Sequence, residues 1–383
     1  MARNRIRTGM AVAAAVMLAV LASAPAVQAK QVPEVERMLA GLAVEAPRTH
    51  KNMLVFPIRW PGKQAPGKWE TLDAALSAGR LKVLEKSQAS VPEVVVENTG
   101  EKTVFLMSGE IIRGGKQTRV IRKDTLVEPK QQVAVPVFCV EQGRWAGGKD
   151  FKRAANIAPA SIQNRINRGA GQAEVWDRVR RTGEAVGAES PTQSLDEVLE
   201  SAPARRKFGE VHKDLGKFSP PDTVGLAVAD ARTGKVVGVE LFGRRDLFEG
   251  LQEKLVEGYA ADLVLTVSPW EEKKAKPVDA DAVQAFITMA LKGTSGYEDT
   301  PGSGRGLGLE SGSIVGKGVA LGEVAIHVSV QDVHPETTPA KPIVTTPPVP
   351  VPRPPRPPRP PIPLPRPEPQ PREPGPPAIR QLR

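Results

Sequence analysis

Hydrophobic and polar residues alternate in short runs after residue 50, as they do in strands with one buried face. These apolar runs lie at residues 52–60, 81–85, 91–98 and 103–107. Thr71 can cap a short helix between the first two runs, which ends at Ser77 before Gly79. We therefore predict a mainly antiparallel β half over residues 46–150, similar to a small sandwich or a partly open barrel.

The hydrophobic pattern of the second half has a longer period. Apolar side chains recur every four residues over 247–263, which predicts an amphipathic helix lying on a hairpin of strands 224–228 and 235–242. The other predicted elements are helices at 159–182 and 279–291, a helix opened by a capping box at 194–197, and closing strands at 313–319 and 323–330. The predicted fold class is thus α+β, with a second half over 151–333 of β-hairpins packed with helices.

The N-terminus has the order of regions found in a secretory signal. Arg3, Arg5 and Arg7 precede an apolar run at 10–21, and small residues lead from there to Ala29. The run is short for a bilayer span, although retention as an uncleaved anchor is the alternative. We expect cleavage after Ala29 and export to the periplasm or the extracellular space. The mature form would have no transmembrane segment, and residues 30–45 would form a lead to the domain.

The C-terminal residues 334–383 form a proline- and arginine-rich tail. Residues 347–377 include 18 prolines among 31 positions. Such a density prevents helix and sheet and favours an extended polyproline conformation, so we predict a disordered tail. The tail is either a spacer or a cationic arm that contacts anionic envelope polymers or lipid headgroups.

The formal charge of +10 lies mainly outside the predicted folded body. The signal contributes +3 and the tail +5, which leaves about +2 for residues 30–333. Nucleic acid is therefore not expected as a partner of the body. The single cysteine, Cys139, alternates with apolar neighbours and is expected to be a buried structural thiol. A reactive thiol would need a base that the fold brings to it.

Two dense polar clusters flank the apolar segment 125–138. The first contains Glu110, Lys116, Gln117 and Arg119, and the second contains Glu141, Gln142, Arg144 and Trp145. Charged and amide side chains at strand ends are costly to bury and usually interact with a ligand or with one another. The segment between them has the turn-then-alternation pattern of a hairpin, which would bring the clusters together in one cleft.

These residue types suggest a catalytic pair with a binding surface. Glu110 and Glu141 are the candidate catalytic residues, because two carboxyl groups divide the acid and the base or nucleophile roles in glycoside cleavage. The candidate ligand-binding residues are Lys116, Arg119 and Arg144 for a phosphate or carboxylate, Gln117 and Gln142 for a hydroxyl or amide, and Trp145 for stacking on a sugar or base. The alternative is a structural network of ion pairs, with Trp145 in the core.

The same residues carry a resemblance to a known family. The strings Ser108-Gly109-Glu110, Lys116-Gln117-Thr118-Arg119 and 139–145 resemble the ARPP family, a domain associated with ADP-ribosylglycohydrolases and rhodanese-phosphatases. The resemblance continues to about residue 332. It implies hydrolysis or transfer at an ADP-ribose-like or other phosphorylated glycoside. A non-catalytic envelope binding module, which recognises a glycan or peptide and is tethered by the tail, is the alternative.

Metal and cofactor sites are not expected. The four histidines, His50, His212, His327 and His334, have no ligand spacing, and the carboxylates are not clustered as in calcium sites. The glycine-rich segment 302–308 opens a strand rather than a helix and lacks the lysine of a P-loop.

Overall fold

The computed structural model of the chain describes residues 32–86, 92–266, 276–291 and 293–333. The predicted signal at 1–29 and the predicted disordered tail at 334–383 lie outside the described residues. The α+β class is confirmed, because helices cover sheets in which almost every strand pair is antiparallel.

The largest sheet has nine strands and takes them from both ends of the body. In spatial order they are β1 (Ala43–Val44), β3 (Met53–Arg59), β13 (Thr223–Asp230), β14 (Lys235–Phe242), β18 (Val324–Asp332), β17 (Ile314–Leu321), β16 (Arg305–Ser311) and β15 (Thr294–Glu298), with β2 (Arg48–His50) also paired to β3. The predicted hairpin of β13 and β14 is confirmed.

Helices cover this sheet on both faces. On one face α2 (Pro33–Ala40) and α9 (Ala280–Leu291) enclose an apolar core. On the other face lies α8 (Arg245–Ala260), which continues into the π-helical segment η1 (Ala261–Leu265) and packs on β13 and β14 as predicted. Because both faces are covered, β13 is buried along its whole length.

Two smaller sheets form the β-rich part of the body. One consists of β10 (Thr125–Val127), β7 (Thr103–Leu106) and β4 (Trp69–Thr71), and the other of β12 (Phe151–Ile157), β8 (Glu110–Gly114), β9 (Arg119–Ile121), β11 (Gln132–Cys139), β6 (Glu93–Asn98) and β5 (Leu81–Glu85). A shared apolar core lies between them, which confirms the sandwich-like prediction. The short helix α3 (Leu72–Ser77) contributes to this core, and Thr71 caps it by accepting the amide of Ala74 at 3.3 Å.

The segment predicted as one helix over 159–182 is two helices, and a further pair follows. They are α4 (Ala160–Asn167), α5 (Gln172–Val186), α6 (Leu195–Leu199) and α7 (Ala202–Leu215). The break falls at Gly169, whose φ of 77° is in the left-handed region that glycine adopts at little cost. The capping box predicted at 194–197 is wrong, because the Ser194 side chain makes no cap hydrogen bond, although α6 does begin there.

The hairpin predicted over 125–138 is also wrong. Strand β10 pairs with β7, whereas β11 pairs with β6 and β9 in the other sheet. A turn closed by the Gln131 amide on the Glu128 carbonyl, at 3.1 Å, carries the chain between the sheets. The alternating pattern of β10 and β11 would also allow them to pair with each other. In the structure they lie in different sheets, on opposite sides of the shared core. The two polar clusters are therefore placed by β8, β9 and β11.

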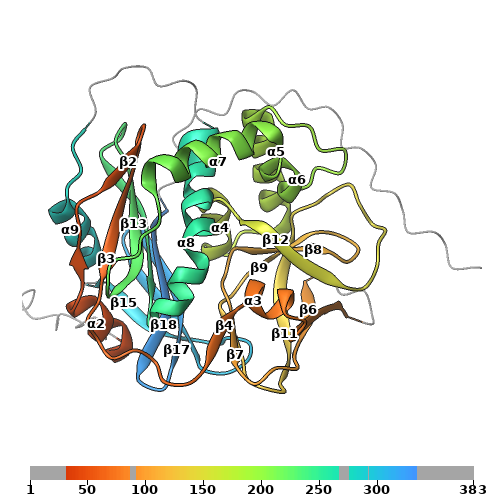
Figure 1. Cartoon of the computed structure of the whole chain (residues 1–383), viewed down its shortest axis with the longest axis horizontal. Helices are drawn as coiled ribbons and strands as arrows, with labels where there is room; N and C mark the ends of the chain where they lie inside the picture. The colour runs from red at the N-terminus through yellow and green to blue at the C-terminus, as the bar shows by residue number, and fades with distance from the viewer. Residues whose placement is uncertain (1–31, 87–91, 267–275, 292, 334–383) are drawn as a thin grey trace, which may run out of the picture. The chain divides into compact units, whose positions relative to one another are not determined.

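Two elements that the sequence pattern did not indicate connect the halves. Strand β12, rich in polar residues, pairs with β8 and makes close contacts with α8. Helix α2 lies within the predicted lead 30–45 and buries Val35, Met38 and Leu39 in the core of the nine-stranded sheet. Figure 1 shows α8 between the nine-stranded sheet and the two smaller sheets, so it touches every layer that bounds the site below.

Candidate functional site: a polar cleft in front of a buried lysine

Glu110 is the first residue of β8 and has no exposed surface. Its Oε2 accepts the amide of Met107 at 2.8 Å, and its Oε1 lies 3.9 Å from Nζ of Lys254 on α8, without a hydrogen-bond donor. Burial raises the pKa of Glu110 to about 8, because Lys254 only partly compensates for the loss of water. The carboxyl group therefore holds a proton at neutral pH, as a proton donor must.

Lys254 is itself buried, with 7% of its surface exposed. Its Nζ lies 2.7 Å from Oδ2 of Asp73, in the first turn of α3. The contact is an ion pair in distance but lacks the angles of a hydrogen bond, and Nζ has almost no accessible surface, so the ammonium group lies behind the cleft wall without a hydrogen-bond acceptor. A buried lysine flanked by two carboxyl groups is typical of functional sites, where burial and charge tune proton affinity.

Two glycines bring α8 close enough for this arrangement. Gly250 and Gly258 lie four residues before and after Lys254, so all three share one face of the helix. A Cβ atom at position 250 would lie 2.9 Å from the Thr71 side chain, and one at position 258 would lie 2.6 Å from the Ile157 side chain. Larger residues would push α8 away from β4 and β12 and separate Lys254 from both carboxyl groups.

Asp73 and Lys254 line a cleft of about 430 Å³. Its other walls include Arg153 and Asn156 from β12, Arg205 and His212 from α7, and Glu257 from α8. Nε2 of His212 lies 2.8 Å from Oε1 of Glu257, and this hydrogen bond raises the pKa of His212 above its ordinary value. The contact with Glu257 thus favours the protonated form of the imidazole. Carboxylate, guanidinium and imidazole side chains thus line the same cleft, with Lys254 in its wall.

Glu141 lies in a closed network of hydrogen bonds. Arg144 donates to both carboxylate oxygens, at 2.8 and 2.7 Å, the Thr118 amide donates at 2.9 Å, and the Thr192 hydroxyl donates at 2.8 Å. Burial by itself would raise the pKa of Glu141, but these donors outweigh it and hold the pKa below its ordinary value. A carboxylate with this many partners has the surroundings of a structural group.

The structure does not bring Glu110 and Glu141 together. Arg144, the partner of Glu141, also donates to the carbonyl groups of Gly114 and Gly115 at the end of β8, whereas Glu110 begins that strand. The five residues of β8 span four steps of roughly 3.3 Å, so its two ends lie on the order of 13 Å apart. Glu110 and Glu141 share no side-chain partner among the described residues, and their catalytic roles stay predictions.

Two of the remaining predicted residues, Lys116 and Arg119, contact Glu85. Gln117 Oε1 accepts from Nη1 of the buried Arg119 at 3.1 Å, and Nη2 of Arg119 lies 3.5 Å from Glu85. The Lys116 amide donates to the same Glu85 oxygen at 2.8 Å. Gln142 is exposed and Trp145 is 46% exposed, so the tryptophan does not belong to the core. Whether these residues bind a ligand stays a prediction.

The sequence pattern missed Asp73, Lys254, His212 and the arginines of the cleft. The available signal was weak: Lys254 adjoins the apolar stripe of α8 and has a glycine four residues away on either side. The other cleft residues come from three separate elements with no motif of their own.

Three further properties bear on the chemistry. Among the residues that the structure describes, no group of three or more His, Cys, Asp or Glu side chains is placed to hold a metal ion. Cys139 is buried and free, and burial raises the pKa of its thiol to about 11, so it is unreactive near neutrality. Within the described ranges, none of the helices has both the length and the apolar character needed to span a bilayer.

The fold and the cleft define a class of α+β domain in which a central helix presents a buried lysine between a nine-stranded sheet and a small β-sandwich. A model of the ARPP-1 family, described as the ARG and Rhodanese-Phosphatase-superfamily-associated Protein domain, matches residues 41–331, and the chain belongs to this family. No curated protein and no solved structure matches the chain.

Proposed function

We propose that this is an exported protein whose Lys254 cleft hydrolyses, or transfers groups at, an ADP-ribose-like or other phosphorylated glycoside. The single observation that carries the proposal is the burial of Lys254 between Asp73 and Glu110 in the wall of a polar cleft. The family description supports chemistry at a phosphorylated glycoside, because it associates the domain with ARG and rhodanese-phosphatase proteins.

The cleft holds both groups that cleavage of a glycosidic bond requires. In this proposal Asp73 supplies the carboxylate, and His212 acts as the acid once a ligand displaces its contact with Glu257. Glu110 has no surface in the cleft, so it acts through Lys254. By holding its own proton, Glu110 leaves Asp73 as the charged partner of Lys254.

Size and charge favour a phosphorylated ligand. A volume of about 430 Å³ lies in the range of small-molecule sites, roughly 300–1,000 Å³. Arg153 and Arg205 are exposed on the walls, and planar guanidinium groups bind phosphate oxygens in pairs. Arg205 has no ion-pair partner among the described residues, so it is the first candidate for a phosphate contact.

A thermal-shift and turnover screen tests the proposal, with ADP-ribose, NAD and cell-wall fragments as probes and the mature chain as the protein. We expect a probe to stabilise the wild type and to be converted, and His212→Asn and Asp73→Asn to abolish conversion. His50→Asn is the matched control, because His50 also contacts a carboxylate, Asp214, at 2.6 Å but does not line the cleft. Equal loss of conversion in His50→Asn, or unimpaired conversion by Asp73→Asn, would contradict the proposal.

A second function is favoured by the pairing already present in the cleft. His212 with Glu257 and Asn156 with Glu200 are closed contacts, which suits recognition of a glycan or peptide without turnover. In this proposal the tail tethers the protein to anionic envelope polymers or lipid headgroups. Saturable binding without conversion, together with salt-sensitive retention on anionic vesicles that a chain ending at residue 333 lacks, would favour the binding module.

A further inference from the structure

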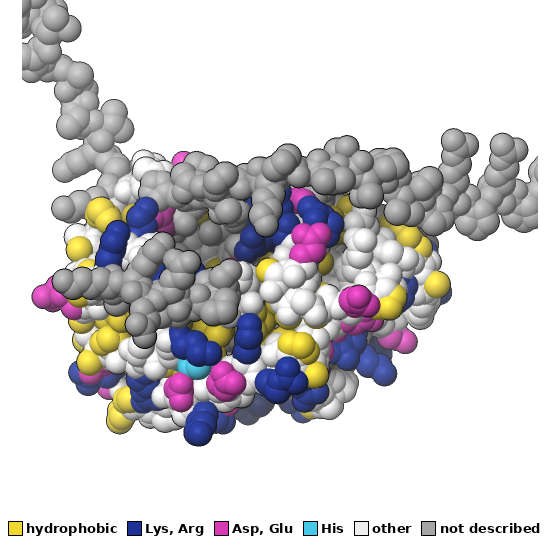
Figure 2. All heavy atoms as spheres, turned by 90° about the horizontal axis from the view of Figure 1, so that it is seen from above, with side chains coloured by type: hydrophobic (Ala, Val, Ile, Leu, Met, Phe, Trp, Pro, Cys, Tyr) yellow, Lys and Arg dark blue, Asp and Glu magenta, His cyan; other side chains and the backbone are white. Residues whose placement is uncertain are grey.

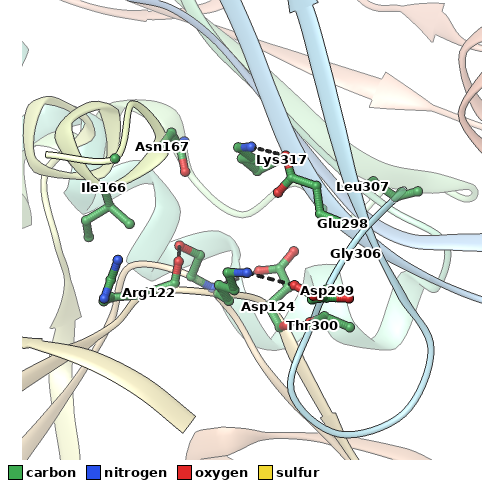
Figure 3. Close-up of a pocket in the computed structure, with 14 residues that line it drawn as sticks. Arg122, Asp124, Ile166, Asn167, Glu298, Asp299, Thr300, Gly306, Leu307 and Lys317 are labelled. Atoms are coloured by element: carbon green, nitrogen blue, oxygen red, sulfur yellow. Dashed lines mark hydrogen bonds and ion pairs between the residues drawn. The ribbon is translucent and has the colours of Figure 1, made fainter. Parts of the chain in front are cut away.

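A second cavity has a volume of about 190 Å³. Its walls come from the loop between β9 and β10, from the end of α4, and from the strands β15 to β17 (Figure 3). Charged side chains dominate the part that faces inward: Arg122, Lys123, Asp124, Glu298, Asp299 and Lys317. The cavity shares no residue with the Lys254 cleft.

Most of these charges are already satisfied. Lys317 is paired with Glu298, and Lys123 Nζ donates to the carbonyl oxygen of Asp299 at 2.7 Å, as the dashed lines in Figure 3 mark. Asp124 accepts from the buried His327 at 2.6 Å and from the Ser108 amide at 2.8 Å. Lys123, Lys317 and Asp124 therefore have partners within the protein and do not need a ligand to satisfy them.

Arg122 is the exception among the cations of the cavity. Its Nε is buried without a hydrogen-bond acceptor, and its guanidinium group forms no ion pair with an acid among the described residues. The guanidinium carbon lies 4.2 Å from the centre of the Phe138 ring, so the ring stacks on the face of the guanidinium group. The N–H donors point outward in the plane of the group, and this stacking does not satisfy them. Burial lowers the pKa of Arg122, because loss of water disfavours the charged guanidinium group.

The backbone holds Arg122 in place for binding. Its amide donates to the Pro136 carbonyl at 3.0 Å, and its carbonyl accepts from the Ser108 hydroxyl at 3.1 Å. With the main chain fixed on both sides and the side chain stacked on Phe138, little conformational freedom remains to be lost when a ligand binds.

The carboxylates in the walls restrict what kind of anion fits. Asp299 has an exposed carboxylate with no partner in the described part of the chain, and Figure 3 shows Arg122 and Asp299 on either side of Asp124. A phosphate, with up to two charges, would be repelled by these acids, whereas a single carboxylate charge is met by Arg122. An ammonium or hydroxyl group on the ligand would in turn satisfy Asp299.

We propose that this cavity binds a small α-amino or α-hydroxy acid, with the carboxylate on Arg122 and the neighbouring ammonium or hydroxyl group toward Asp299. The volume excludes a nucleotide or an oligosaccharide, because it is smaller than the roughly 300 Å³ at which drug-sized sites begin. The inference is independent of the function proposed for the Lys254 cleft.

Calorimetry or ligand-observed NMR on the mature chain tests the proposal with L-alanine, L-lactate, acetate and inorganic phosphate as probes. We expect L-alanine and L-lactate to bind saturably and more tightly than phosphate, and Arg122→Gln to weaken them by about tenfold or more, since a charge-assisted pair is lost. Arg153→Gln, in the Lys254 cleft, is the matched control and should leave this binding unchanged. Loss of conversion in the cleft without loss of amino-acid binding would separate the two proposals.

A second variant keeps the test decisive if Arg122→Gln does not fold. Asp299 is exposed, and its Asp299→Ala variant keeps the carbonyl that Lys123 uses. This change should weaken L-alanine and strengthen acetate, because it removes the partner of the ammonium group and a repulsive charge. Absence of saturable binding, tighter binding of phosphate than of L-alanine, or an unchanged L-alanine-to-acetate ratio in Asp299→Ala would overturn the proposal.

Discussion

Lys254 illustrates how a single residue sets the character of a site. It is almost wholly removed from water, and its ammonium group lies between a paired carboxylate, Asp73, and a protonated carboxyl, Glu110. Deleting one partner of such a buried group is far more damaging than losing a surface ion pair, because the other charge stays buried. For the same reason, substitution of the buried Glu110 or Glu141 should cost more stability than substitution of an exposed acid.

Glu141→Gln should destabilise the folded body. The change removes the charge that pairs with Arg144 and replaces one of the two oxygens that accept from the Thr118 amide and the Thr192 hydroxyl by an NH2 donor, at a cost of about 3 kcal/mol in the free energy of unfolding. Urea denaturation of the purified variant measures this. Glu253→Gln is the control, since its pair with Lys217 is exposed and should change stability by less than about 1 kcal/mol. Unchanged stability with altered ligand binding would instead favour a catalytic or binding role for Glu141.

Two buried groups predict that stability falls at alkaline pH. For His327, burial would lower the pKa, but Asp124 and Glu240 raise it to about 10, so its contribution is complete below the unfolded value of about 6.5 and is lost as pH rises through 10. For Glu110, the raised pKa means that stability present below about 4.5 is lost as pH rises through about 8.

Melting temperatures measured across pH 6 to 10 test this prediction. We expect a monotonic decrease, and Glu110→Gln should remove the part near pH 8 while leaving the part near pH 10. A melting temperature that rises, or stays level, between neutral pH and pH 10 would contradict the assignment of these protons.

At the scale of elements, α8 is the component that joins the layers. It contacts β4, β12, β13 and β14, and its two glycines set how closely it approaches the small sheets. The nearest atoms to an added Cβ are side-chain carbons of Thr71 and Ile157, at distances below 3.0 Å. Close packing leaves no free volume to absorb such a change.

Gly258→Val should therefore destabilise the body and disconnect the site. We expect a loss of about 1–3 kcal/mol in the free energy of unfolding, from forced displacement of α8 against Ile157. Gly209→Ala, in the exposed part of α7 where an added Cβ meets no atom within 4 Å, should instead gain about 0.5–1 kcal/mol. If chemical denaturation gave the same change in the free energy of unfolding for both variants, the close approach of α8 would not contribute to stability.

The prediction of an element was correct where its amphipathic pattern is compatible with only one arrangement. The α8 stripe and the β13–β14 hairpin follow directly from residue spacing. The segment 125–138 shows the opposite case, since its alternation is compatible with a hairpin and with two strands in facing sheets. Strand β12, with Lys152 and Arg153 exposed, has too little apolar pattern to signal a strand and pairs only because β8 offers it an edge.

At the scale of the whole molecule, charge is unevenly distributed along the chain. The body holds about +2 of the formal +10, and on the face shown in Figure 2 Lys and Arg side chains lie interspersed with Asp and Glu. An excess of positive charge at the two ends fits a secretory signal and a cationic tail, and it places the long-range attraction outside the folded part.

N-terminal sequencing of the protein recovered from the producing cells tests the export proposal. The order of charged, apolar and small-residue regions predicts a mature chain that begins at Lys30. We expect this species in the periplasmic or secreted fraction. Substituting Ala29 by Arg should block the cleavage and leave the precursor membrane-associated, whereas intact residues 1–29 on a cytoplasmic protein would defeat the proposal.

The amino-acid sequence by itself determined the α+β class, the sandwich-like first half, the helix over 247–263 and the membership implied by residues 108–119 and 139–145. Each depends on neighbouring residues, because period and turn chemistry act over a few positions. Only the tertiary structure decided which charged groups meet: Glu110 with Lys254 and Asp73, Glu141 with Arg144, and Arg122 with no partner among the described residues. The physical reason is that an ion pair or a cleft depends on distances of a few ångströms between segments far apart in the chain, which strand pairing and helix approach set.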